Sequence, residues 1–95
     1  MHKAIWNGEI LAESRKIKDV NGRKFFPFNS IKKKFFKKSY TRRVDLKIGT
    51  ADFYNIHVND KTNWNAAWYY PHPQKSAADL KGYLAFGGDI DVVNS

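Results

Sequence analysis

Apolar residues along the chain occur in short runs separated by turn residues, which is the pattern of many short strands. Strand-like stretches at 4–6 and 9–13 flank Asn7-Gly8, and a second pair, at 17–20 and 24–26, flanks Asn21-Gly22. Asn-Gly readily occupies the two central positions of a type I′ turn, which both require positive φ. The sequence therefore predicts two hairpins, and with them a β-meander in the N-terminal half.

Further strands and two short helices are predicted beyond Pro27, which cannot donate to a strand ladder. The strands are expected at 40–44, 53–58, 66–70, 83–86 and 90–93. The helices are expected at 31–36, after a cap by Asn29 or Ser30, and at 77–81, after Ser76. We therefore predict a mainly β, compact, antiparallel fold of two sheets or a partly open barrel, with two short helices. No linker or repeat divides the chain, so residues 1–95 are predicted to form a single domain.

The chain is rich in aromatic residues and basic residues and has no cysteine. Aromatic residues make up 16% of its 95 positions, and the formal net charge is +8. Without cysteine there is no disulfide, no thiolate metal site and no cysteine nucleophile, so aromatic rings are expected to build the core. The charge favours partners with phosphate or carboxylate groups.

The hydropathy pattern predicts a cytoplasmic protein without a membrane partner. No stretch is long and apolar enough to span a bilayer, and the first residues lack the apolar run of a signal peptide. No cofactor is predicted, and the sequence does not indicate an oligomeric state.

Several blocks of the sequence resemble one family over nearly the whole chain. They are Trp6-Asn7-Gly8-Glu9 with Ala12-Glu13-Ser14, Phe25-Phe26-Pro27, Gly49-Thr50-Ala51 with Tyr54, Asn63 with Ala66-Ala67-Trp68-Tyr69-Tyr70-Pro71, and Lys81-Gly82-Tyr83-Leu84-Ala85-Phe86. Together they resemble the family numbered 427 among the domains of unknown function, sometimes labelled nucleotidyltransferase-like. The resemblance implies a mostly antiparallel β domain with a tent-like arrangement of sheets, and it implies little about activity.

The chain departs from the family pattern at two places. Members often have Cys-Pro-Trp-Lys where this chain has Asp45-Leu46-Lys47-Ile48, and Asp where Asn65 stands. If the family's Cys and Asp formed a reactive or ligand-binding pair, this chain lacks the nucleophile and has an amide in place of the carboxylate. Asp45 is expected to restore only the negative charge.

A first candidate site combines aromatic and amide side chains. Trp68 and Tyr70 share one face of a predicted strand because side chains alternate along it. Aromatic platforms beside amides suit a flat polar ligand such as a nucleobase, and a nearby lysine suits an anionic group. The predicted ligand-binding residues are Asn63, Asn65, Trp68, Tyr70, Lys81 and Tyr83. The alternative is that both rings belong to the core and the amides only shape a turn.

A second candidate site is a basic segment without any acidic residue. Lysines neutralise backbone phosphates and release counterions, and exposed aromatic rings between them can stack on bases. The predicted polyanion-binding residues are Lys32, Lys33, Lys34, Lys37, Lys38, Arg42 and Arg43, interleaved with Phe35, Phe36 and Tyr40. The alternative is a solvated face that keeps the protein soluble.

Metal binding and catalysis receive little support from the sequence. His2, His57 and His72 are widely separated, and no serine lies in a nucleophile-elbow motif. The sequence therefore favours a non-catalytic binding domain for a small anionic ligand or nucleic acid. Two alternatives remain: an enzyme acting on a nucleotide or related small substrate, and a protein-interaction module anchored by an exposed Trp64.

Overall fold

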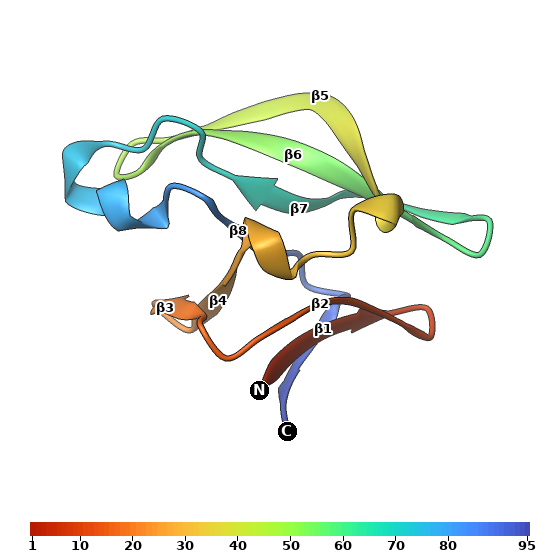
Figure 1. Ribbon diagram of the computed structural model, residues 1–95. Coiled ribbons are helices and arrows are strands. Elements are labelled where there is room, and N and C mark those ends of the chain that lie inside the picture. The colour runs from red at the N-terminus through yellow and green to blue at the C-terminus, as the bar shows by residue number, and fades with distance from the viewer.

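A computed structural model, which describes residues 1–95, has nine strands in two antiparallel sheets (Figure 1). The smaller sheet has the order β2-β1-β9, with β1 His2–Trp6, β2 Glu9–Ser14 and β9 Asp91–Asn94. The larger sheet has the order β3-β4-β8-β7-β6-β5, with β3 Lys18–Val20, β4 Arg23–Pro27, β5 Phe36–Asp45, β6 Gly49–Val58, β7 Lys61–Tyr69 and β8 Tyr83–Phe86. The mainly β, two-sheet prediction is confirmed, and neither sheet closes into a barrel.

Both predicted Asn-Gly hairpins are present. Asn7 and Gly8 have φ of 50° and 81°, and Asn21 and Gly22 have φ of 52° and 86°, as a type I′ turn requires. The prediction of a meander is wrong, because β2 pairs in the smaller sheet whereas β3 pairs in the larger one. The chain crosses between the sheets over residues 15–17.

A third turn with two positive-φ residues joins β6 to β7. Asn59 and Asp60 have φ of 51° and 62°. The sequence pattern predicted only a strand end here, since Asp occupies the position where glycine is the usual signal.

The helix predicted at 31–36 is wrong. The main chain of Ile31 forms a bridge with Ala12, and the Lys32 amide donates to the Leu11 carbonyl at 2.8 Å. Only 3-10 turns flank this contact: η1 Phe28–Ser30 and η2 Lys33–Phe35. Such a short segment gains too few hydrogen bonds to hold an α-helix, and pairing with β2 replaces them. The second predicted helix is also a 3-10 segment, η3 Lys75–Leu80.

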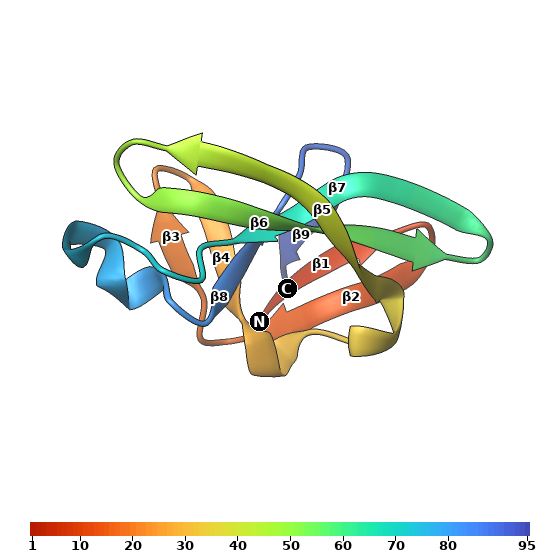
Figure 2. The ribbon, with the colours of Figure 1, turned by 90° about the horizontal axis from the view of Figure 1, so that it is seen from above.

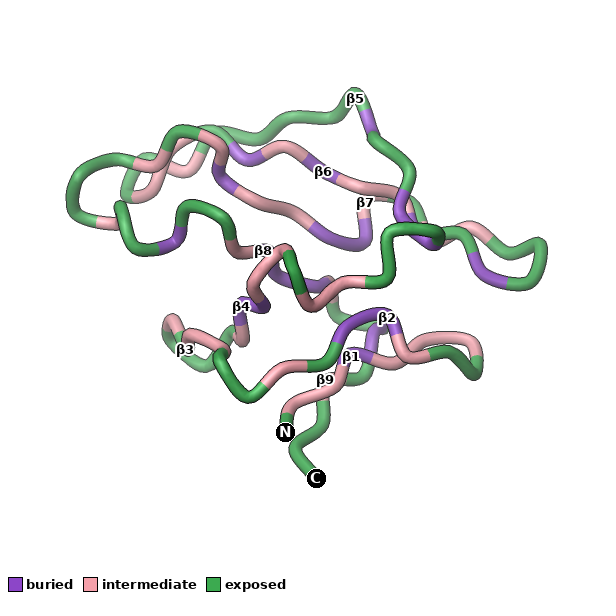
Figure 3. The backbone as a smooth tube through the Cα atoms, viewed as in Figure 1, coloured by how far each residue is buried: buried purple, intermediate pink, exposed green.

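Apolar side chains are buried on both faces of the larger sheet. The face toward the smaller sheet is here called the inner face, and the opposite one the outer face. Figure 3 shows the buried stretches in the central strands and the exposed course of most of β5. Phe26 and Phe86 meet edge to face on the inner side, with ring centres 5.5 Å apart. Phe25 and Phe53 belong to the separate outer cluster. From above, β5, β6 and β7 cross over the strands of the smaller sheet (Figure 2).

Bulges in β5 and β7 lie on either side of β6 near Tyr54. On β5 the register shifts between Lys38 and Arg42. On β7 it shifts between Asn63 and Ala67, the partners of Ile56 and Tyr54 on β6. Within the β7 bulge, Asn65 has a φ of 53°. Its main-chain N–H donates to Asn55 Oδ1 at 2.7 Å, and its side-chain Oδ1 accepts from the Ser39 hydroxyl at 2.6 Å. These contacts connect all three strands.

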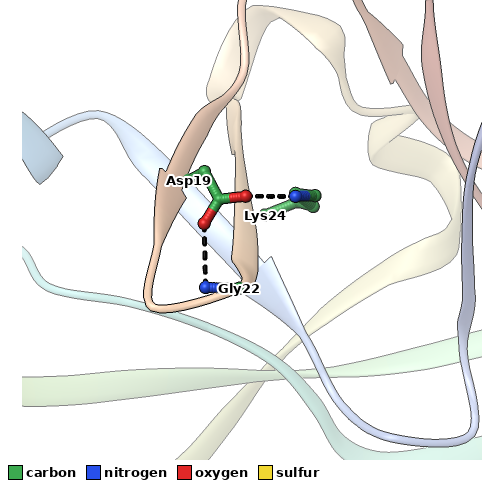
Figure 4. Close-up of polar contacts among 3 residues, drawn as sticks. All are labelled: Asp19, Gly22 and Lys24. Atoms are coloured by element: carbon green, nitrogen blue, oxygen red, sulfur yellow. Dashed lines mark hydrogen bonds and ion pairs between the residues drawn. The ribbon is translucent and has the colours of Figure 1, made fainter.

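Asp19 organises the turn between β3 and β4 (Figure 4). One carboxylate oxygen accepts from the Gly22 amide at 2.8 Å, and the other pairs with the Lys24 ammonium. The hydrogen bond from Lys24 and then that from Gly22 lower the pKa of Asp19 below its ordinary value.

Asp19→Asn is expected to remove an acid-dependent part of the stability. Because the folded-state pKa is lowered, this contribution is fully present above the ordinary aspartate pKa of about 4 and disappears as pH falls through the folded-state value. Urea unfolding at pH values from neutral to strongly acidic should show a free energy of unfolding that depends less on pH in the variant than in the parent. Asp79→Asn, whose parent carboxylate lies 4.0 Å from Lys18 Nζ, is the control and should retain the parent slope.

Asn65→Ala is expected to destabilise the fold more than Asn65→Gly. Both changes remove the Ser39 hydrogen bond, which contributes about 0.5–1.5 kcal/mol. Only alanine must also hold a left-handed backbone, at a cost of roughly 1–2 kcal/mol. Urea denaturation measures the difference between the two variants. Equal stabilities would show that the left-handed conformation at this position is not a constraint.

Candidate functional site

Trp68 and Tyr70 lie on the outer face of the larger sheet beside a small hollow. Trp68 pairs with Phe53 in the β6–β7 register, and the two ring centres are 5.9 Å apart. The hollow has a volume of about 240 Å³ and is lined by Arg43, Val44, Asp45, Ala51, Phe53, Trp68 and Tyr70. Tyr70 is only 6% exposed, so Trp68 offers more of its ring to solvent. The guanidinium of Arg23 lies 5.1 Å from the Trp68 ring centre.

Asp45 borders this hollow but also shapes the turn that leads to Gly49. Its Oδ1 accepts from the main-chain amides of Lys47 and Ile48, at 2.8 and 3.2 Å. Burial, and next the charge of Asp45, raises the pKa of Tyr70. The phenol is therefore neutral at physiological pH and does not repel an anion.

The two amides predicted for this site take part in other contacts. Asn63 Nδ2 donates to both carboxylate oxygens of Asp89, at 3.0 and 3.1 Å. Asn65 belongs to the bulge network with Ser39 and Asn55. Neither amide lines the hollow beside Trp68, so the structure separates the amide and aromatic parts of the predicted constellation.

Lys81 and Tyr83 also lie outside the hollow. Lys81 is exposed after η3, and Tyr83 begins β8. The Lys18 ammonium lies 4.5 Å from the Tyr83 ring centre and donates to the Asp79 carbonyl. Of the predicted ligand-binding residues, only Trp68 and Tyr70 therefore line the hollow, although Tyr83 packs against the same outer cluster.

Asp45 and Asn65, where the family pattern has Cys and Asp, do not form a pair. The main-chain N–H of Asn65 donates to Asn55 on β6, whereas Asp45 pairs with Gly49, six residues earlier on that strand. At about 3.3 Å per strand residue, the two positions are about 20 Å apart along the sheet. A paired role of the family's Cys and Asp has no counterpart in this chain.

The basic residues predicted to bind a polyanion are all exposed and lie on the β5 edge strand and the connection before it. The register directs Lys37 and Arg43 to the outer face, and Lys38 and Arg42 to the inner face. Among them, only Arg42 is paired with a carboxylate, its Nε lying 3.3 Å from Asp52. The segment therefore supplies cations along both faces of one edge.

Arg43 is the residue that joins the basic segment to the aromatic hollow. It lines the same cavity as Trp68 and lies with its guanidinium 5.5 Å from the Phe53 ring centre. Phe53 and Arg23 are contributors that sequence reasoning missed. Phe53 stands in a predicted strand two residues from the Gly-Thr-Ala motif, but only the strand pairing places it beside Trp68.

Two aromatic rings are exposed near the bulges. Tyr40 is 97% exposed on β5, and Trp64 is 73% exposed on β7. Each is the sequence neighbour of a member of the hydrogen-bonded pair Ser39 and Asn65. A buried Trp64 would have argued against the protein-interaction hypothesis, and its exposure keeps that hypothesis open.

A polar hollow of about 440 Å³ lies around the Arg42 and Asp52 pair, with Thr50, Pro71 and His72 as its other lining residues. No three His, Cys, Asp or Glu side chains lie close enough together to hold a metal ion. The helical segments are short 3-10 turns, and none has the length and apolar composition of a membrane-spanning helix.

Comparison with known proteins gives a family and no function. No curated protein matches the chain. One family model, described as a domain of unknown function (DUF427), matches residues 2–94. Since this match covers almost the whole sequence, and since the fold is the antiparallel β fold that the sequence blocks implied, the chain belongs to the DUF427 family.

Proposed function

We propose that this protein is a non-catalytic binding domain for an anionic ligand that contains flat rings, of the class of nucleotides and single-stranded nucleic acid. The observation behind the proposal is the composition of β5. Its Tyr40 ring is 97% exposed and borders one hollow with Lys38 and Arg42, and its Arg43 lines the hollow beside Trp68.

The physical basis is a combination of charge and stacking. Phosphates attract the unpaired Lys37, Lys38 and Arg43, and binding gains free energy from counterion release. Bases stack on exposed aromatic rings, with about 1–3 kcal/mol for each base. Tyr40 and the accessible part of Trp68 are the rings available for this on or beside β5. Neither contact distinguishes one base from another, so the proposal predicts little sequence preference.

The exposed lysines also have a simpler explanation, because charged side chains on an edge strand prevent pairing with other chains. That role accounts for Lys37 and Lys38 but not for Tyr40, since an exposed aromatic ring would favour association. Tyr40 thus separates the two explanations, and its substitution tests stacking independently of charge.

Protein interaction is a second candidate function, favoured by the exposure of Trp64. Tryptophan is enriched among the residues that dominate the binding energy of interfaces. A Trp64→Ala variant that loses a protein partner but retains oligonucleotide binding would support this function instead.

Lys37→Glu with Lys38→Glu is expected to weaken binding of a short mixed oligonucleotide. Loss of two phosphate contacts should reduce the slope of log affinity against log salt by about 1.4, at roughly 0.7 per contact for single strands. Fluorescence anisotropy at several salt concentrations measures this slope.

The matched control is Arg15→Glu with Lys16→Glu, both exposed in the connection between β2 and β3, and β3 is the edge strand opposite β5. Each change of a cation to Glu lowers the net charge by two units, so both double variants lower it from +8 to +4. Equal loss of affinity in the two double variants would mean that net charge alone drives binding.

Tyr40→Ala should weaken oligonucleotide binding without changing the slope of log affinity against log salt, because it removes a stacking ring and no cation.

Titration of nucleotides against the Trp68 indole tests the hollow itself. We expect shifts of the Trp68 indole resonance that persist as salt increases, because ring contacts are less screened than contacts with exposed lysines. Shifts confined to residues 32–43 that vanish with salt would contradict a role of the hollow. NMR spectra of the parent and of Arg43→Gln, which removes the cation lining the hollow, provide the comparison.

A further inference from the structure

A second aromatic hollow, distinct from the polar one around Arg42 and Asp52, lies on the inner face, opposite the side that carries Trp68. Its volume is about 390 Å³, and its lining residues are Phe28, Ile31, Lys33, Phe36 and Tyr54. Figure 1 shows the connection that contains η1 and η2, in orange to gold, running beneath β5, β6 and β7. The hollow is thus bounded by this connection and by the start of β5 and the middle of β6.

The aromatic rings around this hollow hold one another in fixed orientations. Tyr54 meets Phe36 edge to face at 5.7 Å and an interplanar angle of 89°, and it stacks on Tyr69 at 5.3 Å and 24°. Tyr69 in turn meets Phe28 edge to face at 5.1 Å. Phe36 is buried against the inner core, so the arrangement is preorganised rather than formed on binding.

The only charged side chain that lines the hollow is Lys33. It is exposed and has no carboxylate partner. Its neighbour Lys34 does not line the hollow and lies with its ammonium 5.0 Å from the Phe35 ring centre. Burial, followed by the nearby Tyr54 and Asp52, raises the pKa of Tyr69, so the phenol on which Tyr54 stacks is neutral at physiological pH.

We infer that this hollow binds a small planar aromatic carboxylate. The ring packs against Tyr54 and Phe36, and the carboxylate pairs with Lys33. The volume falls within the usual range of ligand pockets, about 300–1,000 Å³, and an apolar wall with one oriented charge is the usual composition of such sites. This inference goes beyond the proposed function, because it uses the opposite face of the sheet and a different set of rings.

A titration with naphthoate tests the inference, with binding monitored by calorimetry and by NMR of the tyrosine rings. We expect saturable binding with shifts at Tyr54, and weaker binding of the neutral analogue naphthalenemethanol. Lys33→Met should weaken naphthoate binding by about tenfold, as loss of one charge-assisted contact predicts, and leave naphthalenemethanol unchanged. Lys34→Met is the matched control and should bind naphthoate as the parent does.

Ile31→Trp fills the hollow and should abolish binding of both probes, and its amide spectrum shows whether it is folded. If that variant does not fold, the pair of lysine variants still decides the outcome. The inference is wrong if naphthoate shifts the Trp68 indole and not Tyr54, if both probes bind equally well, or if the two lysine variants lose affinity equally. Lys37→Glu, on the outer face, should retain naphthoate binding, which separates this site from the outer cations of β5.

Discussion

The larger sheet must bury apolar side chains on both of its faces, and the rest of the structure depends on this constraint. Strand β6 is the clearest case, since Ile56 and Val58 join the inner cluster whereas Ala51 and Phe53 join the outer one. No disulfide supports the chain, so burial of apolar side chains in the two clusters, aromatic rings among them, must hold the sheets together. Leu11 and Ala12 of the smaller sheet pack in the inner cluster, and Leu80 of η3 packs in the outer one.

The local features of the fold could be predicted from the sequence because they depend on neighbouring residues. Asn7-Gly8 and Asn21-Gly22 define their turns through the backbone conformations that those residues tolerate. The division into two sheets could not be predicted, since nothing at residues 15–17 states that β2 and β3 have different partners. The helix prediction at 31–36 was wrong for a related reason. Phe35 and Phe36 fit an apolar helical face, but the contact of Ile31 with Ala12 is a long-range pairing that local periodicity does not contain.

The candidate site, too, could be predicted only as far as the local sequence pattern extends. Alternation along β7 correctly predicted that Trp68 and Tyr70 share a face, because both follow the bulge. Asn63 and Asn65 could not be placed in the same way, since the bulge breaks the alternation before them. The positive φ of Asn65 and its bond to Ser39 account for the amide without any ligand. Its role is therefore to set the path of β7, which in turn positions Trp68 beside Phe53.

The bulges have a second consequence, which concerns the edge strand. A regular β5 would alternate its side chains between the two faces of the sheet. The bulge instead turns Ser39 inward, to 9% exposure, and leaves the neighbouring Tyr40 almost fully exposed. Protection of an edge needs only charge, which the lysines already supply, and an exposed ring adds apolar surface that protection does not need. Under the proposed function, this ring provides the stacking surface between the β5 cations, and it directly follows Ser39, whose hydrogen bond to Asn65 connects β5 to β7.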